Sequence, residues 1–276
     1  MRIALLLEYN GKNFCGSQSQ KDLRTVQSVL EEALAIYFRL NKANTKKPLR
    51  AILSGRTDSG VHSSGQVAHF ELPTEQAEGF EGTDLHAFAW SINGILPDDI
   101  CVKQAATVGT DFHARFIAIE RHYVYRFLNR AQRSPLLVDT HYFVRASLDV
   151  GAMKEAILCL PGSHDFTAFK SSSSDAGSSI CEVKYAKLLN LGEGELEFSI
   201  AANHFVYNMI RIIVGTLVEI GLKKRPVDSI KTALIGAKRK LAGPTAPASG
   251  LSLVSVKYPE PYANIFKFAN AGSQEE

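Results

Sequence analysis

The stretch that decides the fold is AILSGRTDSGVHSSGQVAHFEL, residues 51–72. Two apolar segments, 51–54 and 65–72, flank a middle rich in glycine and serine, and this pattern predicts two strands joined by a turn. The segment that contains this turn, SGRTDSGVHSSGQ (54–66), carries a single carboxylate, Asp58. We expect the turn to hold the backbone of Asp58 and to leave its side chain accessible.

Working outward, apolar periodicity predicts further strands and long helices in mixed order. Expected strands are 2–8, 121–128, 196–201 and 251–258; expected helices are 26–38, with Thr25 as N-cap, 150–160 and 204–220. This order is typical of an α+β protein with antiparallel or mixed sheets and helices packed on one side. Two halves are visible, and we place the boundary between residues 1–148 and 149–276.

Composition excludes several classes of protein. Of 276 residues, 45% are hydrophobic and 21% are charged, which is typical of a globular chain rather than a disordered one. The balance of 31 Lys and Arg against 28 Asp and Glu leaves a net charge of +3. Any nucleic-acid surface must therefore be a local basic patch.

The cysteines and the apolar segments predict a soluble cytoplasmic protein. The cysteines form no CxxC pair and are expected to be reduced, mostly buried thiols: Cys15, Cys101, Cys159 and Cys181. The longest apolar stretch, 205–222, is interrupted by Asn208, Arg211 and Glu219, which argues against a membrane span. No targeting segment is evident.

Asp58 has three readings from the residues around it. An adjacent guanidinium, Arg56, holds a carboxylate ionised, and a fixed, partly desolvated carboxylate suits a nucleophile or general base. Alternatively, Asp58 only bonds nearby amides in an Asx-turn. A metal-dependent hydrolase would use Asp58 with His62 and His69, but the segment has no HxH or HxxxH spacing and no second carboxylate.

The segment FHARFIAIERHYVYRF, residues 112–127, interleaves basic and aromatic residues. In a strand, Arg121, Tyr123, Tyr125 and Phe127 share one face. Arginine beside aromatic rings is how proteins hold unpaired bases. The alternative is a core strand whose aromatic rings pack inward.

The third candidate lies on the helix expected at 204–220. His204, Asn208, Arg211 and Gly215 form one polar line on an otherwise apolar helix. A buried arginine needs a carboxylate partner, and Asp58 is a candidate. Alternatively, this face simply reaches solvent.

Together these segments resemble the TruA family of tRNA pseudouridine synthases. The match covers most of the chain, and its stretches keep the family's order and spacing: YNGKNFCGSQSQ (9–20), TVQSVLEEAL (25–34), GRTDSGVHSSGQVAHF (55–70), ILPDDI (95–100), FHARF (112–116), RHYVY (121–125), GSHDFTAF (162–169), ANHFVYNMIRIIVGTLVEIG (202–221) and GLSLVSVKYP (250–259). The resemblance implies two α+β halves around a continuous, mostly antiparallel sheet with helices packed on it.

The resemblance also implies roles for single residues. Asp58 matches the catalytic aspartate, Arg211 the basic residue that pairs with it, and Tyr123 the tyrosine that stacks on the target base. Arg56 matches an arginine that assists base flipping, and Leu253 an apolar residue of the pocket. The chain departs from the family at Asn10, where Asp is common, at Ser17, where Trp is usual, and at Ser59 and Ser63.

The implied activity is isomerisation of uridine to pseudouridine in the tRNA anticodon stem-loop, at tRNA positions 38–40. The implied protein is a homodimer that needs no metal and no organic cofactor. Basic residues expected to face tRNA are Lys46, Lys47, Arg126, Arg130, Lys223, Lys224 and Arg225. A non-catalytic RNA-binding protein on the same fold is the alternative. The serine-rich run 171–179 is expected to be a loop, either inert or a flap.

Overall fold

One large mixed sheet forms the centre of the molecule. The computed structural model describes residues 1–40, 48–171 and 178–266. Within them ten strands form one sheet in the order β4-β1-β3-β10-β5-β9-β8-β7, with β2 beside β3 and β6 beside β5. The strands are β1 (Arg2–Tyr9), β2 (Ile52–Leu53), β3 (His62–Glu71), β4 (Ile100–Val108), β5 (Glu120–Leu128), β6 (Tyr142–Phe143), β7 (Gly162–Asp165), β8 (Ile180–Gly192), β9 (Glu195–Ala202) and β10 (Leu251–Lys257).

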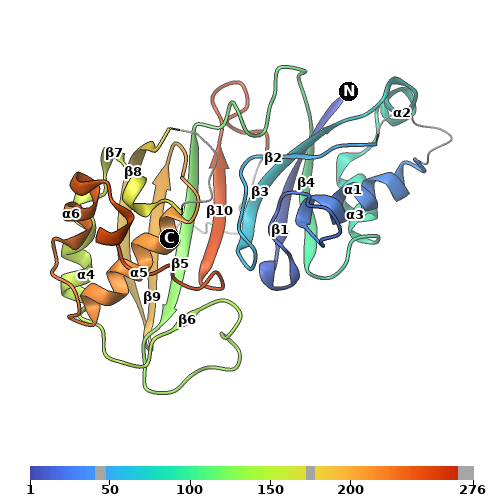
Figure 1. Ribbon diagram of the computed structural model, residues 1–276. Coiled ribbons are helices and arrows are strands. Elements are labelled where there is room, and N and C mark those ends of the chain that lie inside the picture. The colour runs from blue at the N-terminus through green and yellow to red at the C-terminus, as the bar shows by residue number, and fades with distance from the viewer. Residues whose placement is uncertain (41–47, 172–177, 267–276) are drawn as a thin grey trace, which may run out of the picture.

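The pairing of the strands is mostly antiparallel. Only β3 with β10 and β5 with β6 run parallel among the described pairs. Strand β10, near the end of the chain, lies between β3 and β5 and joins them into one sheet (Figure 1). The predicted α+β class with a continuous, mostly antiparallel sheet is therefore confirmed. The domain boundary at residue 148 stays a prediction.

The helices gather beside the two ends of the sheet (Figure 1). Near β1, β3 and β4 lie α1 (Val26–Tyr37), α2 (Thr74–Phe80) and α3 (Leu85–Asn93). Near β5, β8 and β9 lie α4 (Val150–Ala156), α5 (Met209–Gly221) and α6 (Ser229–Gly236). Short 3-10 turns cover Gly11–Asn13, Ile157–Cys159, Thr167–Phe169 and Arg239–Leu241. None of the helices in the described part of the chain combines the length and apolar character that crossing a bilayer requires.

Each group of helices covers its own apolar core. One core contains Leu5, Leu30 and Phe70, and the other contains Phe127, Phe198 and Ile213, all of them fully buried or nearly so. Burying one such side chain stabilises the fold by about 1.5–3 kcal/mol. The two cores therefore anchor the helices at either end. Strand β3 contributes Phe70 to one core and β10 contributes Leu253 to the other, so these neighbouring middle strands link the two cores.

Several expected elements differ from the observed ones. The helix expected at 204–220 begins only at Met209, because Asn208 has a left-handed backbone, with φ 63°, that no helix continues. The helix expected at 150–160 ends at Ala156 and tightens into a 3-10 turn. Thr25 caps α1 as predicted, with Ser28 completing a capping box. Strands β4, β6, β7 and β8 and helices α2, α3 and α6 were not predicted.

Candidate active site

The loop between β2 and β3 carries Asp58 and is fastened on both sides of it. The Thr57 amide donates to Ser17 Oγ at 2.8 Å, and the Ser17 amide donates to the Thr57 carbonyl at 3.0 Å. The Thr57 hydroxyl lies 2.8 Å from the Tyr9 hydroxyl, and burial raises the pKa of Tyr9 to about 12. The loop is thus held from β1 and from the segment that precedes α1.

Gln66 on β3 holds the start of this loop. Its amide nitrogen donates to the Gly55 carbonyl at 3.0 Å, and its oxygen accepts from Ser54 Oγ at 2.6 Å. Gln66 and Ser54 are fully buried. Buried polar groups with satisfied hydrogen bonds rigidify their surroundings, so the backbone that leads to Asp58 is preset. After Asp58, Ser59 Oγ donates to the Phe14 carbonyl at 3.1 Å.

Asp58 forms an ion pair with Arg211 of α5. Arg211 Nη1 donates to Asp58 Oδ2 at 3.1 Å, and each side chain is 19% exposed. Burial raises the pKa of Asp58 above its ordinary value, and the charge and hydrogen bond of Arg211 oppose this rise. The contact expected between these two residues is therefore observed, across 153 positions of sequence.

The geometry of α5 explains why Arg211 is held so firmly. Its Nε donates to the Ala246 carbonyl at 2.8 Å, and the Ala246 amide donates to the Arg211 carbonyl at 3.0 Å. The segment around Ala246 passes this close because residue 215 is glycine: a Cβ there would lie 1.8 Å from the Pro244 carbonyl oxygen. Gly215, expected on a polar line, thus serves packing.

Tyr123 and Leu253 lie opposite each other on neighbouring strands. They are register partners on β5 and β10, with 8% and 0% of their surfaces exposed. The Tyr123 ring meets Phe205 edge to face, with centroids 5.2 Å apart. Burial raises the pKa of Tyr123, and the nearby charge of Asp58 adds to the rise, so the hydroxyl stays protonated. Tyr125 and Phe127, expected on the same face, pack in the core.

Two expectations about site residues are wrong. Arg56 is exposed, and the guanidinium in contact with Asp58 is that of Arg211, so Arg56 does not hold the carboxylate ionised as expected. His204 precedes α5 and does not share a helical face with Arg211; its Nε2 lies 3.4 Å from the Ser178 carbonyl.

The two histidines of the metal reading hydrogen-bond to backbone groups. His62 accepts from the Gly11 amide through Nδ1 at 3.1 Å, and its Nε2 lies 2.8 Å from the Asp139 carbonyl. His69 accepts from the Ala114 amide at 3.2 Å, and burial lowers its pKa to about 4. Within residues 1–40, 48–171 and 178–266, no three His, Cys, Asp or Glu side chains are grouped to hold a metal ion.

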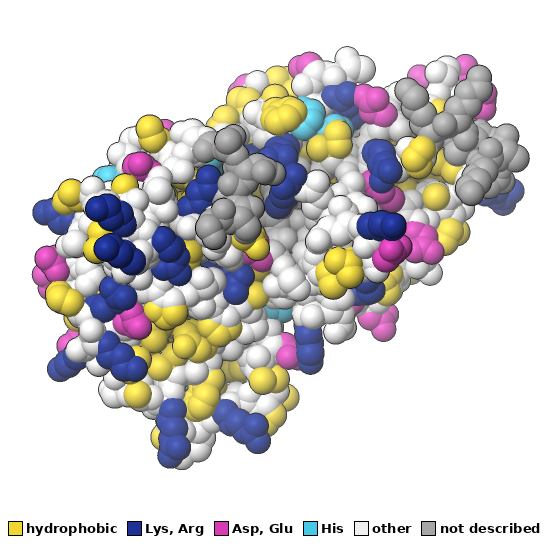
Figure 2. Space-filling view, in the orientation of Figure 1, with side chains coloured by type: hydrophobic (Ala, Val, Ile, Leu, Met, Phe, Trp, Pro, Cys, Tyr) yellow, Lys and Arg dark blue, Asp and Glu magenta, His cyan; other side chains and the backbone are white. Residues whose placement is uncertain are grey.

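The expected basic residues divide into different environments. Lys and Arg gather over the lobe that contains α4, α5 and α6 (Figure 2), where Lys223 and Lys224 are exposed. Arg225 is half-buried and paired with Glu219, and Arg126 is paired with Glu197 at 3.2 Å. Lys46, Lys47 and most of the serine-rich run lie outside the described residues.

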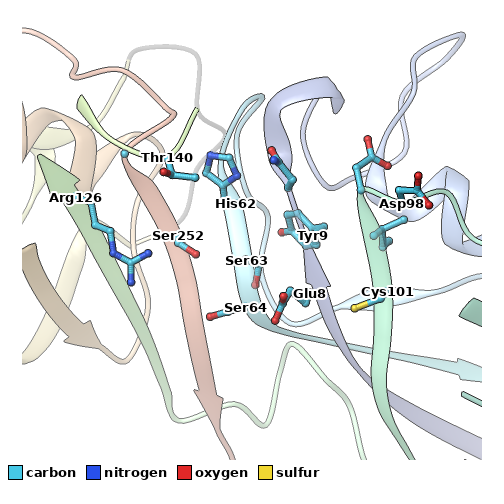
Figure 3. Close-up of a pocket in the computed structure, with 14 residues that line it drawn as sticks. Glu8, Tyr9, His62, Ser63, Ser64, Asp98, Cys101, Arg126, Thr140 and Ser252 are labelled. Atoms are coloured by element: carbon cyan, nitrogen blue, oxygen red, sulfur yellow. The ribbon is translucent and has the colours of Figure 1, made fainter. Parts of the chain in front are cut away.

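A separate pocket of about 290 Å³ lies across the middle strands (Figure 3). Adjacent strand residues point to opposite faces, and Ser252 lines this pocket while Leu253 is buried against Tyr123. The pocket therefore lies on the face of the sheet opposite Tyr123. Its lining includes the charged or titratable side chains of Glu8, Asp98, Asp99, His62 and Arg126 and none of the five expected site residues.

Comparison with known proteins decides the family of a chain with this site. The model of the tRNA pseudouridine synthase family matches residues 6–117 and 156–259. The chain belongs to this family. The tRNA pseudouridine synthases A of Blochmanniella pennsylvanica and Actinobacillus pleuropneumoniae are 38% and 41% identical to it; the alignments cover 95% of both chains in the first case and 94% of both in the second.

Other matches differ in strength. The tRNA pseudouridine synthase A of Acetivibrio thermocellus is 40% identical over 93% of this chain and 99% of the relative. The solved archaeal box H/ACA Nop10–Cbf5 complex aligns with a TM-score of 0.34 at 12% identity, over 79% of this chain and 44% of that one. This overlap is too low to support any argument, whereas the full-length relatives place the chain in the pseudouridine synthase family.

Two features of the site were missed by sequence reasoning. The first is the hydrogen-bonded network of Tyr9, Thr57 and Gln66. In the sequence, Tyr9 and Gln66 are visible only as polar side chains in apolar strand segments, and Thr57 only as the neighbour of Asp58. Ser17, noted only as a departure from the family, accepts the Thr57 amide hydrogen bond. A buried hydroxyl or amide inside a strand is the signal that points to such a network.

Proposed function

We propose that the protein isomerises uridine to pseudouridine in the anticodon stem-loop of tRNA, at tRNA positions 38–40, with Asp58 as the catalytic residue. Family membership supports tRNA as the substrate and isomerisation as the reaction. The observation that carries the assignment to Asp58 is its partly buried ion pair with Arg211. Tyr123 is near enough for the charge of Asp58 to raise its pKa.

Asp58 is prepared for chemistry at one oxygen. Oδ2 accepts from Arg211, whereas Oδ1 has no hydrogen-bond partner among the described residues. A carboxylate held through one oxygen in a partly dry site presents the other as a nucleophile or base. Oδ1 is therefore the atom that we assign to the reaction.

Two routes use this oxygen. In the first, Oδ1 bonds to C1′ of the uridine, and the electron pair of the C1′–N1 bond leaves on uracil. In the second, Oδ1 removes the 2′ proton, a C1′–C2′ double bond forms and uracil leaves with the same electron pair. In both routes uracil turns before C5 bonds to C1′. In the first route the Oδ1–C1′ bond breaks as the C5–C1′ bond forms, and its electron pair returns to the Asp58 carboxylate. In the second route C2′ takes back the proton from Asp58 as C5 bonds to C1′. A base then removes the C5 proton.

The remaining residues serve the extruded base. A paired uridine is inaccessible, so the nucleotide must leave the stack at a cost of a few kcal/mol. Tyr123 stacks on the extruded uracil, Leu253 supports the ring from the neighbouring strand, and Arg56, exposed on the loop, braces the vacated space. Arg211 keeps the Asp58 carboxylate charged and oriented.

We also propose a cytoplasmic homodimer that needs no cofactor. A resemblance to the TruA family supports the dimer, and a tRNA substrate fits the cytoplasm. Sedimentation velocity of the purified protein measures the dimer directly, and a monomer at micromolar concentration contradicts it.

The test is tritium release from tRNA transcripts labelled at uridine C5, because C5 loses its proton only when the C–C bond forms. We compare wild type, Asp58→Asn and a matched control, Asp99→Asn. Asp99 lies outside the site, and its carboxylate is paired with Arg24 at a distance of 2.7 Å. We expect release by wild type and the control and none by Asp58→Asn.

Two further controls test which uridines react and whether the reaction needs a metal ion. Transcripts with cytidine in place of uridine at positions 38–40 should release no tritium. Tight tRNA binding without release favours the non-catalytic RNA-binding alternative. Release that a chelator abolishes contradicts a cofactor-free reaction.

A further inference from the structure

Asn208 shares one nitrogen of Arg211 with Asp58. Its Oδ1 accepts from Arg211 Nη1 at 2.9 Å, and its Nδ2 donates to Ser171 Oγ at 2.9 Å. The same Nη1 donates to Asp58 Oδ2 at 3.1 Å. An Nη group has two hydrogens, so Asn208 and Asp58 together use both.

The orientation of the Asn208 amide follows from its partners. Arginine has only donors, so the atom facing Arg211 must be the amide oxygen, and the amide nitrogen then faces Ser171. With Nε bound to the Ala246 carbonyl, three N–H groups of Arg211 have assigned acceptors. Two of these acceptors belong to the protein scaffold, and the third is Asp58.

The backbone of Asn208 explains why asparagine stands here. With φ 63° and ψ 6°, the residue adopts the left-handed conformation, which asparagine tolerates better than most side chains. An asparagine directly before a helix normally caps it, but this side chain makes no capping bond to α5. Its amide serves Arg211 instead.

We propose that Asn208 is a positioning residue for the reaction: by occupying one hydrogen of Arg211 Nη1, it directs the other hydrogen at Asp58 Oδ2. This inference rests on the proposed function. The Ala246 carbonyl holds the guanidinium at Nε, and Asn208 and Asp58 hold it at Nη1, so losing Asn208 leaves the carboxylate as the one assigned acceptor of Nη1 among the described residues. Asn208 does not touch the uridine and acts only through Arg211.

The experiment measures kcat, KM and the pH profile of tritium release for Asn208→Gly. Glycine accepts the left-handed backbone without strain, so the variant removes the amide and keeps the start of α5. We expect kcat to fall about tenfold, as for loss of one hydrogen bond to a charged group, with KM within about twofold of wild type. The acid limb of kcat should move to higher pH. Arg211 lowers the pKa of Asp58, so a weaker contact between the two raises that pKa.

A double-mutant cycle separates positioning from general damage. In an Arg211→Ala background, Asn208→Gly should cause no further fall in kcat, because its partner is already gone. Asn208→Asp is the second variant: it keeps the shape but places a second carboxylate on Nη1, so the acid limb should again move up. This variant also covers the case in which the glycine variant does not fold.

Three results overturn the inference. These are an unchanged kcat in Asn208→Gly, an equal fall in both backgrounds, and an acid limb that does not move in Asn208→Asp. Failure of the proposed function looks different, because wild type itself then releases no tritium.

Discussion

Replacing Arg211 by alanine tests how the protein keeps a carboxylate reactive in a partly buried site. The Asp58 side chain is 19% exposed beside Arg211, and the substitution removes its only charged partner among the described contacts. Breaking a buried ion pair costs about 3–5 kcal/mol, and losing one hydrogen bond to a charged group costs about 1.5–3 kcal/mol. A single bond at 3.1 Å with residual exposure places this pair in the lower range.

A loss of about 2–3 kcal/mol in the transition state corresponds to a fall in kcat of roughly 30- to 150-fold. The direction with pH follows from the causes of the Asp58 pKa. Burial raises this pKa and Arg211 lowers it, so removing Arg211 raises it further. Activity that needs the Asp58 carboxylate should therefore begin to fall at a higher pH in Arg211→Ala than in wild type. Part of the lost rate should return as the pH rises and Asp58 ionises.

The assay is tritium release under saturating tRNA from about pH 6 to about pH 9, with tRNA Kd measured in parallel. Arg50→Ala is the matched control, since Arg50 is paired with Glu31 of α1 at 3.2 Å and is neither in the site nor among the basic residues expected to face tRNA. We expect Kd to change little in Arg211→Ala. A kcat within twofold of wild type, or a loss confined to Kd, would refute the reasoning.

Three further predictions concern the scaffold of the site. Tyr9→Phe removes the hydroxyl that bonds Thr57, so urea unfolding should show a loss of about 1 kcal/mol together with a lower kcat; unchanged values contradict the anchoring of the loop. Leu253→Ala should lower the free energy of unfolding by about 2–5 kcal/mol, because the side chain is fully buried, whereas Leu253→Met should restore most of it. His69 has a folded pKa of about 4, below its ordinary value of 6.5, so it contributes stability above pH 6.5 that is lost as the pH falls toward 4. Unfolding of His69→Gln should depend less on pH over this window, and an identical dependence in both proteins counts against a buried neutral histidine.

How much of the fold was predictable depends on the kind of element. Strongly periodic segments such as α1 and β5 were predicted almost to the residue, because their apolar spacing and the Thr25 cap are local signals. The start of α5 was misplaced, because Asn208 has a left-handed backbone and its side chain bonds Ser171 and Arg211, and neither feature is readable from apolar periodicity. Short or exposed elements such as α2 and β7 carry too few apolar residues to be recognised.

The sequence by itself determined the α+β class, the turn that carries Asp58 and the resemblance that named a family. It did so because these features lie in contiguous residues whose spacing and chemistry are local. Only the tertiary structure decided which guanidinium pairs with Asp58. The late strand β10 inserts between β3 and β5 and brings Leu253 to Tyr123, while α5 brings Arg211 across 153 positions of sequence. Such contacts depend on how the two cores pack against one sheet, and that arrangement is a property of the whole chain.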